Sequence, residues 1–335
     1  MTAITQERAA RSSVRDLLQP LRGIAQTQEF ILLLVLLVLG IVVGTISPRF
    51  LAQRNVSDIL LNSSYIAVAA IGQAMVIVAG EIDISVGSLI GVLATISGTL
   101  AVSGAPIWVA WFVPLIVGPL VGAFIGFLVA YLRIPSIVVS LGMLSILQGG
   151  LIIATGGAWI YNLPQGFMFA QQRWLGLPIP VYLMIVLTII AAWFMRYTAL
   201  GRSIYAVGGN REAARLSGIS ERRVTMMVFI INGFMVAVSS IMFATQFNSI
   251  QSSVPSGLNL TIITAAVVGG VSILGGVGTV IGSTIATILL RAITSEMVFV
   301  NLSAYWIQAV QGLLILVTVL VDLVRRRRQA ASLAR

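Results

Sequence analysis

Long apolar stretches, each about as long as a bilayer is thick, divide the chain and constrain its fold more than any other feature. The first of them, residues 30–47, carries no charged side chain and stops before Pro48. Hydrophobic residues make up 58% of the chain and charged residues 9%, whereas a soluble domain has about 25% charged residues. Ten-residue segments of alternating polar and apolar residues are absent, which disfavours a β-barrel. The chain is therefore predicted to be an all-α polytopic membrane protein.

At about 20 residues per crossing, the chain has room for about ten transmembrane helices. The predicted spans are about 30–47, 62–80, 84–103, 107–132, 136–155, 179–195, 224–245, 260–274, 278–298 and 304–322. The eighth is short, and we expect it to be broken or partly re-entrant. These spans divide the chain into three predicted regions: a cytoplasmic N-terminal tail at 1–29, a transmembrane domain at 30–323 and a basic cytoplasmic tail at 324–335.

The basic residues, all of them arginine, predict the orientation of the chain. Most lie in three clusters, within 8–22, 196–223 and 325–328, and the net charge is +10. Arginines are retained on the cytoplasmic side during insertion, so both termini and the loop 196–223 are predicted to be cytoplasmic. Ten crossings return all three clusters to that side, although Arg49 and Arg54 run against the rule. Membrane orientation thus explains the charge, and no nucleic-acid partner is expected.

The connection 196–223 is the longest charged interval between spans, and it has a helix pattern of its own. Residues 208–210, Gly-Gly-Asn, form a turn sequence, because Gly and Asn tolerate positive φ. Asn210 is then positioned to cap a short helix that begins at Arg211. Ser and Gly at 217–218 predict the end of that helix.

An apolar face on this short helix is of the size that docks onto another protein. It consists of Ala213, Ala214 and Leu216, and Glu212 lies near the positive N-terminal end of the helix. Two interpretations stay open: a segment that docks onto a partner, and a solvated basic loop that only sets orientation. The candidate docking residues are Gly209, Asn210, Arg211, Glu212, Ala213, Ala214, Arg215, Leu216, Ser217 and Gly218.

Two carboxylates, Glu81 and Asp83, lie between predicted spans with no arginine near them in the sequence. Charges at membrane depth are costly and are usually functional. At a cytoplasmic helix end, Asp83 or Ser85 would cap the span 84–103, which is one interpretation. The other is a gate or a partner contact, in a segment that runs to Gly87. Acid–base catalysis is disfavoured, since no nucleophile, metal ligand or histidine accompanies the pair.

A second glycine-rich stretch occupies residues 267–283. It lacks the Lys and the following Ser or Thr of a phosphate-binding loop, so nucleotide binding is disfavoured. Close helix packing and a tight turn suit these glycines, and a moving gate is compatible with both. The residues concerned are Gly269, Gly270, Gly275, Gly276, Gly278 and Gly282.

Uncharged polar residues in or beside the spans are the candidates for a translocation path for a neutral polyol. We select Asn62, Gln73, Asn232 and Asn248, although a single amide in a span more often forms an interhelical hydrogen bond. The chain has no Cys and no His, which removes disulfides, thiol chemistry and histidine metal ligands. No catalytic residue, metal site or cofactor is predicted. Arg291 and Glu296, near the ninth span, are expected to pair or to snorkel.

Three segments taken together resemble a known family. They are GEIDISVGSLIG at 80–91, LGRSIYAVGGNREAARLSGI at 200–219 and AAVVGGVSILGGVGTVIGS at 265–283. They are similar to the permease subunits of bacterial ABC importers for monosaccharides, of the ribose, xylose, rhamnose and autoinducer-2 type. The similarity runs from about 30 to 323, nearly the whole chain.

The resemblance implies a pair of ten-helix permeases in the bacterial inner membrane, formed by two copies or by a copy and a paralogue. It further implies a cytoplasmic ATPase that binds coupling helices and a periplasmic protein that delivers the sugar. Residues 210–218 match the coupling helix, and residues 81–87 match an acidic loop to which the resemblance assigns no role. Arg291 stands where the family often has a neutral residue.

Two other functional classes remain for comparison. A stand-alone sugar carrier driven by an ion gradient usually needs titratable groups inside the spans, and only Glu81, Asp83 and Glu296 qualify. An intramembrane enzyme would need a nucleophile with its base, which is not recognisable. The preferred hypothesis is a transport subunit that has no energy source of its own.

Overall fold

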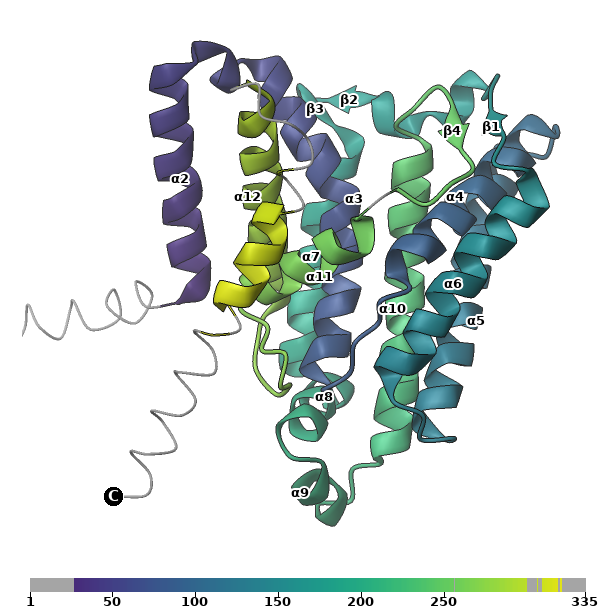
Figure 1. Cartoon of the computed structure of the whole chain (residues 1–335), viewed down its shortest axis with the longest axis vertical. Coiled ribbons are helices and arrows are strands. Elements are labelled where there is room, and N and C mark those ends of the chain that lie inside the picture. The colour runs from purple at the N-terminus through teal and green to yellow at the C-terminus, as the bar shows by residue number, and fades with distance from the viewer. Residues whose placement is uncertain (1–26, 256, 300–305, 307–308, 319, 321–335) are drawn as a thin grey trace, which may run out of the picture.

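The computed structural model describes residues 27–255, 257–299, 306, 309–318 and 320, and in this part of the chain helices dominate (Figure 1). Helices of the bundle are α2 (Gln28–Ile46), α3 (Gln53–Val78), α4 (Val86–Val102), α5 (Ile107–Ala130), α6 (Ser136–Thr155), α7 (Ile179–Tyr197), α10 (Glu221–Ala244), α11 (Leu258–Val268) and α12 (Val280–Phe299). Two further helices, α8 (Ala199–Gly209) and α9 (Arg211–Leu216), lie at the lower end of the bundle in Figure 1. The predicted all-α class is confirmed.

Short irregular elements cover the opposite end of the bundle. They are the 3₁₀ turns η1 (Pro48–Leu51), η2 (Gln165–Phe167) and η3 (Phe169–Gln171), and the two-residue strands β1 (Trp159–Ile160), β2 (Arg173–Trp174), β3 (Leu177–Pro178) and β4 (Ile250–Gln251). β1 pairs antiparallel with β4, and β2 pairs antiparallel with β3. Pairing of β1 with β4 joins two connections that lie far apart in the sequence.

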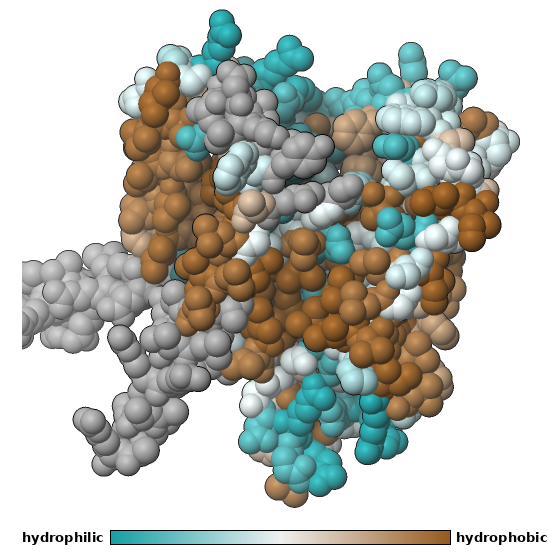
Figure 2. Space-filling model, viewed as in Figure 1, coloured by the Kyte–Doolittle hydropathy of each residue, from teal (hydrophilic) through white to brown (hydrophobic). Residues whose placement is uncertain are grey.

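An apolar band crosses the middle of the face that Figure 2 shows. Figure 2 shows hydrophobic residues across the centre of the visible face and hydrophilic residues gathered at both ends. Among the described residues, seven helices are long and apolar enough to cross a membrane, and three apolar helices are shorter: Val86–Val102, Leu258–Val268 and Ala309–Thr318. Each of the ten predicted spans contains or overlaps one of these helices. Ten crossings, and cytoplasmic tails that fall almost wholly outside the described residues, stay predictions.

Two predicted boundaries are wrong. α3 begins at Gln53, well before the predicted start at residue 62. A transmembrane helix can begin with polar turns that lie at the bilayer surface, before its apolar segment. The connection 196–223 holds a second helix besides the predicted one, because α8 occupies Ala199–Gly209. Residues 208 and 209 accordingly end α8 and do not form a positive-φ turn.

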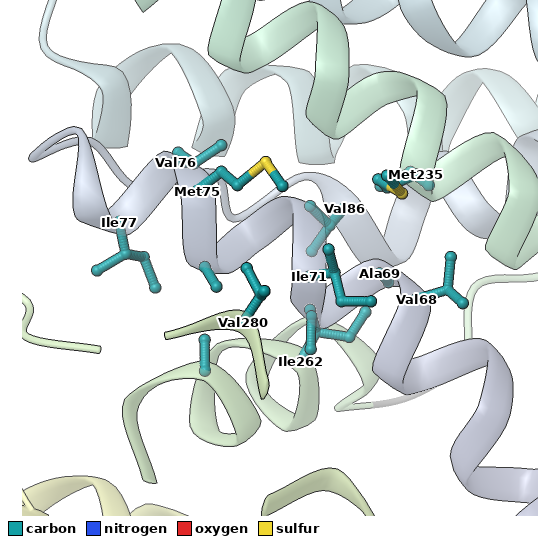
Figure 3. Close-up of a cluster of buried hydrophobic side chains, with 14 of the residues drawn as sticks. Val68, Ala69, Ile71, Met75, Val76, Ile77, Val86, Met235, Ile262 and Val280 are labelled. Atoms are coloured by element: carbon teal, nitrogen blue, oxygen red, sulfur yellow. The ribbon is translucent and has the colours of Figure 1, made fainter. Parts of the chain in front are cut away.

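α3 forms the centre of the bundle. Its sequence from Tyr65 to Val78 consists mostly of small and β-branched apolar residues, and nearly every side chain there is buried. Figure 3 shows Ile71, Met75 and Val76 of α3 in one cluster with Met235, Ile262 and Val280, which come from α10, α11 and α12. Small side chains let neighbouring helices approach α3 from several directions.

Glycines bring α5 and α10 into close contact. Gly118, Gly122 and Gly126 recur every fourth residue on α5, and they face the α10 backbone around Phe229 and Gly233. A methyl group at Gly122 would collide with the Phe229 carbonyl. This is the packing that small residues spaced by four permit in membrane helices.

α11 is too short to cross a bilayer by itself. Its 11 residues extend about 16 Å, roughly half the thickness of the hydrocarbon layer. The glycine-rich segment 269–279 follows it and leads to α12 at the α8 end of the bundle. The expectation of a broken helix in this region is confirmed.

Candidate functional site

The α8–α9 corner is built as the sequence predicts at its capping positions. Asn210 is the N-cap of α9, and its side-chain oxygen accepts a hydrogen bond of 3.0 Å from the amide of Ala213. Ser217 is the C-cap, and Gly218 follows with φ +81°. The extended backbone of Asn210 separates the two helices, so α9 forms a distinct step at the bundle end (Figure 1).

The predicted apolar face of α9 divides into a buried and an exposed part. Ala214 is 4% exposed and packs into the main core, whereas Leu216 is 79% exposed. Glu212 and Arg215 form an exposed ion pair of 2.7 Å one turn apart. The helix therefore presents one large apolar side chain with charges beside it to the solvent.

α8 packs tightly on the end of α3 and on the glycine-rich segment. A methyl group at Gly208 would collide with the Val78 carbonyl, which also accepts a 2.8 Å hydrogen bond from the amide of Gly276. The Tyr205 hydroxyl donates to the Gly278 carbonyl at 2.8 Å. Burial, and then the nearby Glu29 carboxylate, raise the pKa of Tyr205 above its ordinary value.

The glycine-rich segment is thus a packing element, as predicted. Gly269 and Gly282 lie against each other, and Gly275 and Gly276 lie against glycines of the α3 end and of α8. Gly270, Gly275, Gly276 and Gly278 have positive φ, which favours glycine. A gating role for the segment remains a prediction.

Arg211 connects α9 to two other elements. Its guanidinium donates to the Glu81 carboxylate at 2.7 Å, to the Gly80 carbonyl at 3.2 Å and to the Glu221 carboxylate at 3.0 Å. Glu81 lies in the α3–α4 loop, residues 79–85, and Glu221 begins α10. Glu81 therefore has a basic partner, which is 130 residues away in the sequence.

Asp83, at the other end of the loop 79–85, is 3% exposed and has a polar partner for each carboxylate oxygen. One oxygen accepts from the Ser85 amide at 2.9 Å and from the Ser85 hydroxyl at 2.6 Å. The other accepts from the Asn232 side-chain amide at 2.9 Å. The Gln73 amide, with its nitrogen toward the Asp83 carbonyl, donates there at 3.1 Å and accepts from the Asp83 amide at 3.3 Å.

The capping interpretation of the acidic loop is only partly right. Ser85 occupies the N-cap position of α4, but its side chain forms no capping hydrogen bond there, and its hydroxyl donates to the Asp83 carboxylate instead. Gly87, in the first turn of α4, lies against the backbone of Asn259 at the start of α11. The two short helices therefore meet near their N-terminal ends.

Sequence reasoning missed the two serines of α6 that hold the loop. The amide of Ile82 donates to the Ser136 hydroxyl at 3.2 Å, and the Ser140 hydroxyl donates to the Ile82 carbonyl at 3.4 Å. The four-residue spacing of the serines puts both on one face of α6, and this pattern could have identified them.

Beside Arg211 lies a cleft of about 490 Å³, open to the solvent. Four arginines line it, Arg133, Arg211, Arg215 and Arg222, together with Glu81, Glu212 and Glu221. The cleft lies between α9, the start of α10 and the connection from α5 to α6. Seven of the residues that line the cleft are therefore charged.

The four path candidates do not line one channel within this chain. Gln73 and Asn232 meet at Asp83, as interhelical hydrogen bonds. Asn62 bonds the Asp58 carbonyl of its own helix, and Asn248 accepts from Gln171 in the connections at the β1–β4 end. Which residues contact a solute therefore stays a prediction.

Arg291 does not use Glu296 as a partner. Its guanidinium donates weakly to the Asn62 carbonyl at 3.5 Å and to the Tyr65 hydroxyl at 3.3 Å, which joins α12 to α3. Within the described residues, no group of three metal-binding carboxylates comes together.

Comparison with known proteins finds similar sequences among membrane transport permeases. Residues 55–319 match a family described as "Branched-chain amino acid transport system / permease component". The chain is 35% identical over 303 residues to the autoinducer 2 import system permease protein LsrC of Salmonella typhi. The matched residues make up 90% of this chain and 87% of the relative. The protein of the same name from Escherichia coli O157:H7 is 34% identical, with 90% and 89% covered.

A third relative, from Enterobacter sp. strain 638, carries the same name and is 35% identical over 313 residues, 93% of this chain and 91% of the relative. No solved structure matches the chain. The chain therefore belongs to this permease family, and it is a multi-pass inner-membrane transport subunit of the ABC importer class.

Proposed function

We propose that this chain is the membrane-spanning subunit of an ATP-driven importer, and that a separate cytoplasmic ATPase binds the α9 corner, residues 209–218. The observation that carries the proposal is the shape of that corner. A capped helix stands at the end of the bundle and presents Leu216 beside the Glu212–Arg215 pair. A large exposed apolar side chain with charges around it is typical of a protein contact.

The energy source is expected to lie outside the chain. The sequence contains no lysine, so it cannot form the Walker motif that holds the phosphates of ATP in such ATPases. ATP binding that closes a partner dimer would push α9 and switch the path between outward and inward access as a movement of whole helices. The permease would act as a pair, with a second copy or a paralogue.

The proposed cargo is a monosaccharide or a similar neutral polyol, delivered by a periplasmic binding protein at the β1–β4 end. The relatives are named as permeases for autoinducer 2, and the family description names branched-chain amino acids. The polar residues selected from the spans are uncharged amides, which suit hydroxyl groups. A zwitterionic amino acid would instead need groups that compensate both of its charges, such as helix ends or charged side chains.

Uptake into proteoliposomes tests the proposal. The full chain is reconstituted with the ATPase and the binding protein that co-purify with it, and labelled ribose, autoinducer 2 and leucine are supplied with and without ATP. We expect ATP-dependent uptake of ribose or autoinducer 2. Uptake of leucine instead would overturn the proposed cargo class. Uptake by the chain alone that collapses with a proton uncoupler would overturn the proposed energy source.

A further inference from the structure

We propose that the α3–α4 loop, residues 79–85, is the positioning element that carries movement of α9 into the membrane core. Arg211 holds its Glu81 end, and its Asp83 end is bound between α3 and α10. The inference rests on the proposed function and adds to it a role for the two carboxylates. It names the residues through which the motion passes.

α9 has few other attachments through which it could act on the core. Of its six side chains, only that of Ala214 is buried. The Glu212–Arg215 pair is internal to the helix. Arg211 is therefore the main side chain by which α9 binds a different element, and its two acidic partners belong to the loop 79–85 and to α10.

The Glu81 contact is the less exposed of the two ion pairs that Arg211 forms, although the Arg211 side chain itself is 48% exposed, and this makes it the better suited of the two to transmit force. The Glu81 side chain is 9% exposed, and the pair is the shorter of the two that Arg211 forms, 2.7 Å against 3.0 Å. A charge-assisted hydrogen bond to a buried carboxylate is stronger than the same contact to an exposed carboxylate. The more exposed Glu221 contact is expected to yield first when α9 moves.

Between Glu81 and Asp83, the loop is held less firmly than at its ends. Ile82 bonds the serines of α6 at 3.2 and 3.4 Å, which are longer than the hydrogen bonds that the Glu81 and Asp83 carboxylates accept. A displacement of Glu81 is therefore passed along two peptide units to Asp83. The side chain and the backbone of Asp83 together contact α10 and α3.

The Asp83 end of the α3–α4 loop is bound in an apolar environment. Gln73 and Asn232 are at most 1% exposed, so neither can replace its bond to Asp83 with a bond to water. A buried polar group that loses its partner is costly, so α3 and α10 must follow Asp83 or exchange partners as a unit. Such a cluster has discrete arrangements, which a two-state transporter requires.

Single-cysteine labelling tests the proposal, because the chain contains no cysteine of its own. Ile84→Cys, with Ile82→Cys as a second reporter, is introduced into the full chain assembled with its co-purifying ATPase. The rate of reaction with N-ethylmaleimide is measured without nucleotide and with ATP plus vanadate. We expect the trapped nucleotide to change the rate. Glu81→Gln should abolish that change and lower transport roughly tenfold, as for the loss of a charged hydrogen bond.

Arg223→Gln is the matched control, because it removes an exposed charge from the same end of the bundle without contacting the loop. It should keep both the nucleotide-dependent rate change and transport. ATPase co-purification and basal ATP hydrolysis should persist in Glu81→Gln, which separates lost transmission from failed assembly. A nucleotide-dependent change that survives in Glu81→Gln overturns the proposed route. A chain that binds no ATPase overturns the proposed function itself.

Discussion

The carboxylate of Asp83 and the side-chain amide of Asn232 form a buried hydrogen bond of 2.9 Å, although 149 residues separate them. The bond joins the α3–α4 loop to the middle of α10. Asp83 uses both carboxylate oxygens, whereas the side-chain oxygen of Asn232 has no partner among the described residues. The pair is therefore asymmetric, and its polarity can be reversed by substitution.

Reversal of this pair gives the first prediction. Asn232→Asp should strongly destabilise the chain, by about 3 kcal/mol or more, because it places two buried carboxylates against each other. The double variant Asp83→Asn/Asn232→Asp should recover most of that loss. In it, the amide at position 83 donates to the carboxylate at 232 and its oxygen still accepts from Ser85. Thermal unfolding of the purified full chain in detergent measures both effects.

Asn248→Asp is the control for this pair of variants. It makes the same chemical change on an exposed residue of the β1–β4 end, and its midpoint should remain close to that of the parent chain. A double variant as unstable as Asn232→Asp alone would contradict the assigned hydrogen bond.

The sequence predicted features whose causes are local. Apolar stretches determine the spans, and the Asn210 cap and the Gly218 stop depend on neighbouring residues only. The pairing of Glu81 with Arg211 could not be predicted, because it depends on how α3 and α9 pack in space. The turn expected at 208–210 is only partly right for the same reason, since the chain breaks at Asn210, whereas Gly208 is required by the approach of Val78 and not by its own φ.

Gly208 and Gly209 provide the second prediction. Gly208→Ala should destabilise the α8 end by about 3 kcal/mol, because its methyl group would meet the backbone of Val78, which cannot move aside cheaply. Gly209→Ala should be neutral or slightly stabilising, since nothing lies within 4 Å of the added carbon and alanine favours helix. Unfolding midpoints of the two variants should therefore diverge. Equal midpoints would contradict the packing of α8 on α3.

The third prediction concerns the cap of α9. Asn210→Ala removes the acceptor for the amide of Ala213, which costs about 1 kcal/mol at a helix N-terminus. Amide exchange in α9 should accelerate roughly fivefold, with little change in the global unfolding midpoint. Asn210→Asp keeps an acceptor and should exchange at the parental rate. Unchanged exchange in Asn210→Ala would show that the cap does not hold the helix.

Two leucines at opposite ends of the bundle give the last prediction, which tests the docking surface directly. Leu216 on α9 is 79% exposed and Leu175 between β2 and β3 is 81% exposed, so Leu→Ser at either position should leave the unfolding midpoint unchanged. Only Leu216→Ser should weaken binding of the ATPase, roughly tenfold. A central apolar side chain contributes more binding free energy than the residues at the rim of a protein interface. Affinity measured with the purified full-length partners distinguishes the two variants. Equal affinities would mean that the ATPase binds elsewhere on the chain.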